Sequence, residues 1–152
     1  MALCTKLDYE TKFMLYEPGE RTTTLERHCV FVHSVVTSEN STIFVAEHSN
    51  QLVGYLLVNG GRLNRIKHVG YIVVGILEGY QGQGIGAKLF QAMEKWRQSV
   101  GLKRLELTVM AHNEAAISSY KKMGFEMEGM KKNSLVIEGK YIDEYYMGKT
   151  FE

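Results

Sequence analysis

The chain has 152 residues, of which 45% are hydrophobic, and its formal net charge is +1. This length and composition predict one globular domain over residues 1–152, and the near-neutral charge argues against a nucleic-acid partner or an anionic membrane surface. Two cysteines indicate neither a disulfide scaffold nor a metal site. Because no N-terminal apolar run and no stretch of about 18 apolar residues occurs, we expect a cytoplasmic protein without a membrane span.

The first forty residues predict one helix. Lys12–Tyr16 can form an opening strand, and Glu17-Pro18-Gly19-Glu20 has the composition of a turn. A helix is predicted from Leu25 to Val36, capped by Thr23 or Thr24. Its expected buried stripe consists of Leu25, Cys29, Val32 and Val36.

Three strands are predicted next. Thr42–Glu47 and Leu52–Val58 are predicted as strands on either side of the tight turn His48–Gln51, which is typical of a hairpin. His68–Leu77 is almost entirely apolar, as expected of a strand covered on both faces. This third strand is therefore placed in the centre of the sheet.

The second half alternates strands with helices. A helix is predicted from Ala87 to Val100, with Leu89, Met93 and Trp96 buried and Gly101 ending it. The remaining elements are a strand at Arg104–Met110, a helix at Asn113–Met123, and strands at Phe125–Met130, Leu135–Ile137 and Tyr141–Phe151. This order predicts an α/β fold with a mixed, mostly antiparallel sheet and one parallel crossover.

The segment Gln81-Gly82-Gln83-Gly84-Ile85-Gly86 lies between the central strand and the following helix. Bare amides at a helix N-terminus bind anions, most often phosphate. The spacing does not fit the Walker A loop, and its glycines do not fit the dinucleotide fingerprint. It does fit Q/R-x-x-G-x-G/A, the pyrophosphate loop for acetyl-coenzyme A (acetyl-CoA). The alternative is a glycine-rich turn that only lets the helix pack closely against the sheet.

A second pattern follows at Asn113-x-x-Ala116-Ile117-x-x-Tyr120-x-Lys122-x-Gly124-Phe125. Together, the two patterns resemble the signatures of the GNAT superfamily of acyl-CoA-dependent N-acetyltransferases, over Thr42 to Phe151. The terminal strands look most like the ribosomal-protein and polyamine acetyltransferase branch. The resemblance implies a twisted sheet that splays at the acetyl-CoA site. It also implies that the strand or helix which usually opens the fold is shortened here.

The resemblance also implies the site residues. A backbone amide of the central strand would polarise the thioester carbonyl, and Tyr120 would donate a proton to the departing CoA thiolate. The expected cofactor contacts are Val74, Gly75, Ile76, Gln81, Gly82, Gln83, Gly84, Ile85, Gly86, Ala87, Asn113 and Tyr120.

The residues offer several candidates for the general base that would deprotonate the amine. Val69–Leu77 carries no carboxylate, and the position on the next strand where other members carry one is occupied by Thr108. Glu106 lies two residues earlier on the same predicted face and is the candidate base. His112 has a suitable pKa range, and ordered water is a further route.

The predicted reaction is acetyl transfer from acetyl-CoA to a primary amine, such as a protein N-terminus, a polyamine, an amino acid or an aminoglycoside-like compound. Two alternatives remain at this stage: a CoA-binding sensor without catalysis, and an interaction domain without a cofactor. Tyrosines in the terminal strands, namely Tyr141, Tyr145 and Tyr146, can supply a homodimer interface.

Overall fold

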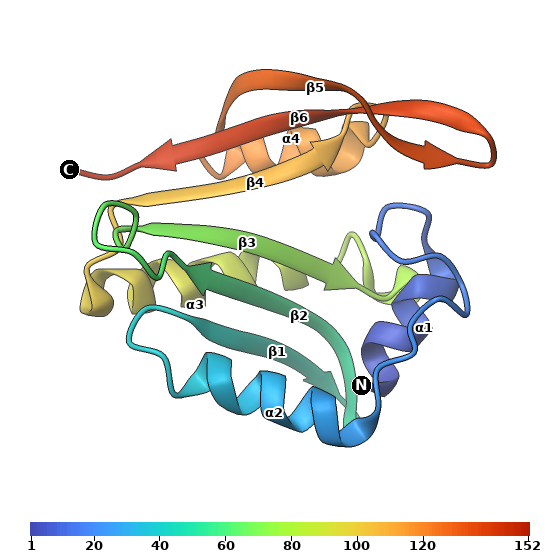
Figure 1. The fold of residues 1–152 in the computed structure, drawn as a ribbon, viewed down its shortest axis with the longest axis horizontal. Coiled ribbons are helices and arrows are strands. Elements are labelled where there is room, and N and C mark those ends of the chain that lie inside the picture. Colours follow the sequence, from blue (N-terminus) through green and yellow to red (C-terminus); the bar gives the residue numbers. More distant parts are fainter.

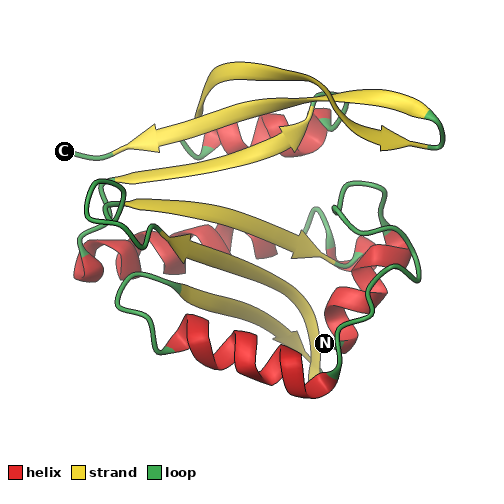
Figure 2. Cartoon of the chain, viewed as in Figure 1, coloured by secondary structure: helices red, strands yellow, loops and turns green.

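The computed structural model describes residues 1–152 as one six-stranded sheet with four α-helices (Figures 1 and 2). The helices are α1 (Ala2–Glu10), α2 (Leu25–Val36), α3 (Ile85–Val100) and α4 (Glu114–Lys122), with a short 3₁₀ turn at Glu78–Tyr80. The strands are β1 (Thr42–His48), β2 (Gln51–Gly60), β3 (Val69–Ile76), β4 (Arg104–Met110), β5 (Glu126–Ile137) and β6 (Lys140–Thr150). No helix is both long enough and apolar enough to cross a membrane.

The sheet has the order β1-β2-β3-β4-β6-β5, so β3 is central, as expected. Every neighbouring pair is antiparallel except β3 and β4, which are parallel and joined through α3. A parallel pair needs such a crossover because the chain must return to the starting edge of the sheet. The predicted mixed α/β fold is confirmed.

The main core lies between the sheet and the two helices α3 and α4. Leu89, Phe90 and Met93 of α3 are buried there with Ile117 of α4 and with strand residues such as Ile72. A second, smaller cluster forms where α1 packs against β2 and the end of β3; it consists of Leu3, Leu7, Val53 and Leu77. The N-terminal helix is thus attached to the half of the sheet that contains β1, β2 and β3 (Figure 1).

The sheet opens between β3 and β4. Only three residue pairs join these strands, at Val69–Arg104, Gly70–Leu105 and Tyr71–Glu106. Seven pairs join β3 to β2, and seven join β4 to β6. Figure 1 shows the two strands diverging beyond the paired end, which leaves the β4-facing edge of Ile72–Ile76 without a partner strand.

Several helix and turn signals are confirmed. The Thr24 hydroxyl caps α2 by accepting a hydrogen bond from the Arg27 amide. Gly101 ends α3 with a φ of 75°, a left-handed conformation that glycine adopts without strain. Ser49 and Asn50 both have positive φ, as the two-residue turn of a tight hairpin requires.

Four sequence predictions need correction. Lys12–Tyr16 forms turns and bends instead of a strand, and a helix (α1) precedes it. In α2 the side chain turned to the core is Val35, whereas Leu25 and Val36 are 63% and 54% exposed. Val32 belongs to two sets of residues with helical spacing. In the folded chain the set that contains Val35 is turned to the core, and the predicted set is not.

The other corrections concern element boundaries. Helix α3 begins at Ile85, two residues before the predicted start, because Gly84 is already its N-cap. Residues 126–137 form the single strand β5, with register shifts at Met127/Gly129 and Lys131/Leu135, where two separate strands were predicted. A strand with a bulge resembles two separate strands in sequence, because the extra residue breaks the alternation of side chains between the two faces of the sheet.

Candidate active site

The unpaired edge of β3 is one wall of the candidate site. The Leu77 amide donates to the Val53 carbonyl of β2, whereas the Ile76 carbonyl accepts from the Gln81 side chain instead of from β2. Because backbone groups alternate along a strand, the amides of Val74 and Ile76 face the gap beside β4. The gap therefore offers main-chain donors to an extended ligand.

The glycine loop forms the end of this wall. Residues 81–84 are exposed, and Gly82 and Gly84 have φ values of 71° and 80°. The first helical hydrogen bond of α3 runs from the Lys88 amide to the Gly84 carbonyl, so the amides of residues 85–87 have no intrahelical partner. These amides and the helix dipole suit a phosphate group.

Packing does not explain two of the three glycines. A Cβ atom built on Gly82 or Gly84 would meet nothing within 4 Å, whereas one on Gly86 would touch Ile76 at 3.4 Å. The positive φ values of Gly82 and Gly84 favour glycine at both positions. The open surface above them leaves room for a ligand that approaches the backbone, such as the pyrophosphate of CoA.

Tyr120 lies in the last turn of α4. Its ring packs against Phe90 and Phe125, with centroids 6.0 and 6.1 Å away. Burial, together with the nearby Tyr71, raises the pKa of Tyr120 to about 12. The hydroxyl therefore keeps its proton at neutral pH, as a proton donor must.

This raised pKa predicts a loss of stability in alkali. The folded chain binds the Tyr120 proton more tightly than the unfolded chain, whose tyrosine pKa is about 10. The stabilisation is complete below pH 10 and is lost as the pH rises to about 12, for a total of roughly 3 kcal/mol. Urea unfolding at pH 9 to 12 should show the stability gap between the wild type and Tyr120→Phe narrowing by this amount. A constant gap would contradict the prediction.

Asn113 serves as the N-cap of α4. Its side-chain oxygen accepts a hydrogen bond from the Ala116 amide at 3.2 Å. The sequence pattern suggested a contact with the cofactor, and the capping role was missed although Asn is a favoured N-cap residue. The cap fixes the start of the helix that carries Tyr120.

The candidate bases are both engaged with neighbours. Glu106 accepts a hydrogen bond at 3.0 Å from Arg104, which also binds Glu128. The His112 ring packs against Phe13, with centroids 5.2 Å apart. Neither Glu106 nor His112 forms a hydrogen bond with Tyr120.

The segment between α1 and α2 crosses toward the other half of the sheet, which the sequence did not predict. Besides the contact between Phe13 and His112, Lys12 forms an ion pair with Glu138 in the β5–β6 turn. No short motif marks these contacts, since each joins segments that are far apart in the chain. They place the segment beside the open end of the gap.

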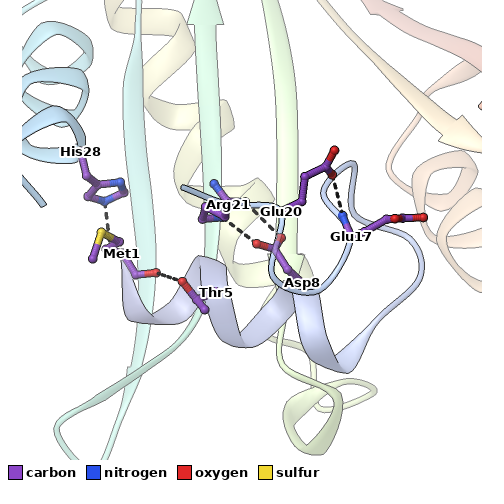
Figure 3. A network of polar contacts seen from close by, with 7 residues as sticks. All are labelled: Met1, Thr5, Asp8, Glu17, Glu20, Arg21 and His28. Carbon is purple, nitrogen blue, oxygen red and sulfur yellow. Dashed lines mark hydrogen bonds and ion pairs between the residues drawn. The ribbon is translucent and has the colours of Figure 1, made fainter. Parts of the chain in front are cut away.

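A buried ion pair holds this segment at its other end (Figure 3). The Arg21 guanidinium donates to both carboxylate oxygens of Asp8, at 2.6 and 3.0 Å, and Asp8 is only 2% exposed. The Tyr16 ring lies 4.3 Å from the same guanidinium. These hydrogen bonds raise the pKa of Arg21, which stays charged.

Comparisons with known proteins agree with this geometry. The model of the acetyltransferase (GNAT) family matches residues 5–125. An L-amino acid N-acetyltransferase of Escherichia coli is 33% identical over 107 residues, which cover 70% of this chain and 66% of that protein. For the curated relatives of Escherichia coli and Bacillus subtilis, the matched part spans 66% and 55% of their own length.

Solved structures extend the similarity to nearly the whole chain. A GNAT-family acetyltransferase from Streptococcus pneumoniae has 30% identity and a TM-score of 0.94, covering 99% of this chain and 90% of that one. A putative acetyltransferase from Salmonella typhimurium, solved with acetyl-CoA, has 16% identity and a TM-score of 0.86, covering 99% and 86%. The latter similarity establishes the fold alone.

Proposed function

Because the chain belongs to the acetyltransferase (GNAT) family, we propose that it transfers the acetyl group of acetyl-CoA to a primary amine. The observation that carries this proposal is the gap between β3 and β4, which has free backbone donors along one side and the glycine loop at its end. The two features lie in the order that acetyl-CoA requires, with its pantetheine arm along the strand edge and its pyrophosphate at the glycine loop.

The residues of the donor site have distinct tasks. The amides of Val74 and Ile76 face the gap and can bind the ligand's polar arm and polarise a carbonyl. The amides of residues 85–87 can bind the pyrophosphate. Bound acetyl-CoA supplies an acetyl thioester, whose carbonyl carbon bonds to the amine nitrogen as the bond to sulfur breaks. Tyr120 gives its proton to the sulfur, and the proton released by the nitrogen restores it.

Replacement of Tyr120 by phenylalanine tests this assignment. Turnover should fall by about 10²-fold, which is the low end for loss of a general acid, whereas the dissociation constant of acetyl-CoA should change little. Release of free thiol from acetyl-CoA measures turnover, with L-amino acids, polyamines and short peptides as acceptors. Calorimetry measures acetyl-CoA binding.

Tyr141→Phe is the matched control, since Tyr141 is 70% exposed in the β5–β6 hairpin. Unchanged turnover in Tyr120→Phe would remove Tyr120 from the mechanism. Binding of acetyl-CoA by the wild type without thiol release for any amine would instead favour a CoA-binding sensor.

We further propose a small-molecule or peptide amine as acceptor. Asp143 accepts a hydrogen bond from the Asn133 amide, and Glu144 accepts from Lys131 and Ser134. These acids are thus occupied within the hairpin, so they do not point to a cationic acceptor. A homodimer through the terminal strands stays a prediction.

A further inference from the structure

The hydroxyl groups of Tyr71 and Thr108 meet at the closed end of the gap. Tyr71 is the last residue of β3 that pairs with β4, and it lies opposite Glu106. Thr108 follows Glu106 by two residues. The two hydroxyl oxygens are 2.8 Å apart, and both side chains are partly buried. This hydrogen bond joins the strands just where their backbones stop pairing.

The pair lies on the opposite face of the sheet from α4. Ile72 and Leu107 point into the core beneath α3 and α4, so their strand neighbours Tyr71 and Thr108 point to the other face. Tyr120 approaches from the α4 side, and Tyr71 is close enough to contribute to its raised pKa. The gap therefore has a proton donor on one face and a hydroxyl pair on the other.

The one carboxylate on β3 and β4 is already bonded to another side chain. Strand β3 contains none. Glu106, the nearest acid on β4, is bonded to Arg104, which lies at the paired end of the strand. The hydroxyl pair is therefore the polar group best placed to meet an amine that enters from the face opposite Tyr120.

We propose that Tyr71 and Thr108 bind the acceptor amine and relay its proton to water, an inference that rests on the acetyl transfer proposed above. A hydroxyl oxygen can accept from an N–H group while its own proton is donated onward. The ammonium proton moves to the Tyr71 oxygen, the Tyr71 proton moves to the Thr108 oxygen, and the Thr108 proton moves to solvent water. Each hydroxyl again carries one proton, and the nitrogen lone pair is free to attack.

The proton count of the whole reaction then balances. An ammonium group loses two protons when it becomes an amide. The relay carries the first to water, and the second replaces the proton that Tyr120 gives to the sulfur. No additional reactant is needed.

The test compares Tyr71→Phe and Thr108→Val with Thr108→Ser, which retains the hydroxyl. For the best acceptor of the thiol-release panel, we expect Tyr71→Phe and Thr108→Val to lower kcat/KM at neutral pH by about 10²-fold. The loss should shrink as the pH approaches the pKa of the amine, because the amine then arrives neutral. Thr108→Ser should retain most activity, and the double variant should be no worse than either single variant.

Acetyl-CoA affinity in all variants should stay within about twofold of the wild type, which separates this role from a folding defect. An equal loss of kcat/KM at every pH, or no loss of kcat/KM, would overturn the relay while leaving the proposed acetyl transfer intact. A wild-type chain that acetylates no amine would overturn the proposed function itself. Tyr141→Phe again controls for loss of a tyrosine hydroxyl away from the gap.

Discussion

Gly84→Asp is expected to weaken acetyl-CoA binding by about 10³-fold. Gly84 is the N-cap of α3, and a side chain there would project into open space over the loop. Two unit charges about 4 Å apart repel by roughly 4 kcal/mol near a protein surface, and each 1.4 kcal/mol corresponds to a tenfold change in affinity. The carboxylate would thus oppose the pyrophosphate directly.

Gly84→Asn is the matched control. Asparagine has the same size and tolerates the left-handed conformation about as well, but it carries no charge. Calorimetry with acetyl-CoA should therefore show a much smaller loss for Asn than for Asp, while both variants melt at similar temperatures without ligand. Equal affinities for the two variants would show that no anionic group binds at this loop.

Replacement of Arg21 by methionine is expected to destabilise the fold by about 3–5 kcal/mol. The change leaves the Asp8 carboxylate buried without its partner, and an uncompensated buried charge carries a cost of this size. For a chain of this length the loss corresponds to a fall in melting temperature of about 10 °C. Thermal and urea unfolding measure it.

The double variant Asp8→Leu/Arg21→Met distinguishes the pair from the packing around it. Well-packed apolar residues replace a buried ion pair at little or no cost in many proteins, so the double variant should recover most of the loss. A double variant as unstable as Arg21→Met would show that contacts such as the Tyr16 ring on Arg21 carry the stability instead.

Much of the fold could be predicted because local signals dominate there. The Thr24 cap, the Ser49-Asn50 turn and the end of α3 at Gly101 each depend on a few neighbouring residues. The apolar run of β3 identified the central strand for the same reason. The glycine loop could be recognised equally well, since Gly82, Gly84 and Gly86 lie at alternate positions of one short segment.

The proposed acceptor site and the segment between α1 and α2 were harder to predict because their contacts are long-range. Tyr71 and Thr108 are 37 residues apart, and Lys12 and Glu138 are 126 apart. Such pairs depend on how strands and loops are brought together, which no local spacing encodes. Asn113 was hard to assign for a different reason. Its side chain fits both the N-cap of a helix and the family signature, and the sequence does not say which role it has.

The main-chain edge of β3 has a consequence for natural variation. Its donors are amides that every residue except proline possesses. Sequence drift at positions 72–76 is therefore limited by what the neighbouring helices accommodate, as Gly75 illustrates: a methyl group there would collide with Leu7 of α1. The side chains of β3 can therefore vary widely without loss of the main-chain amides that would bind acetyl-CoA.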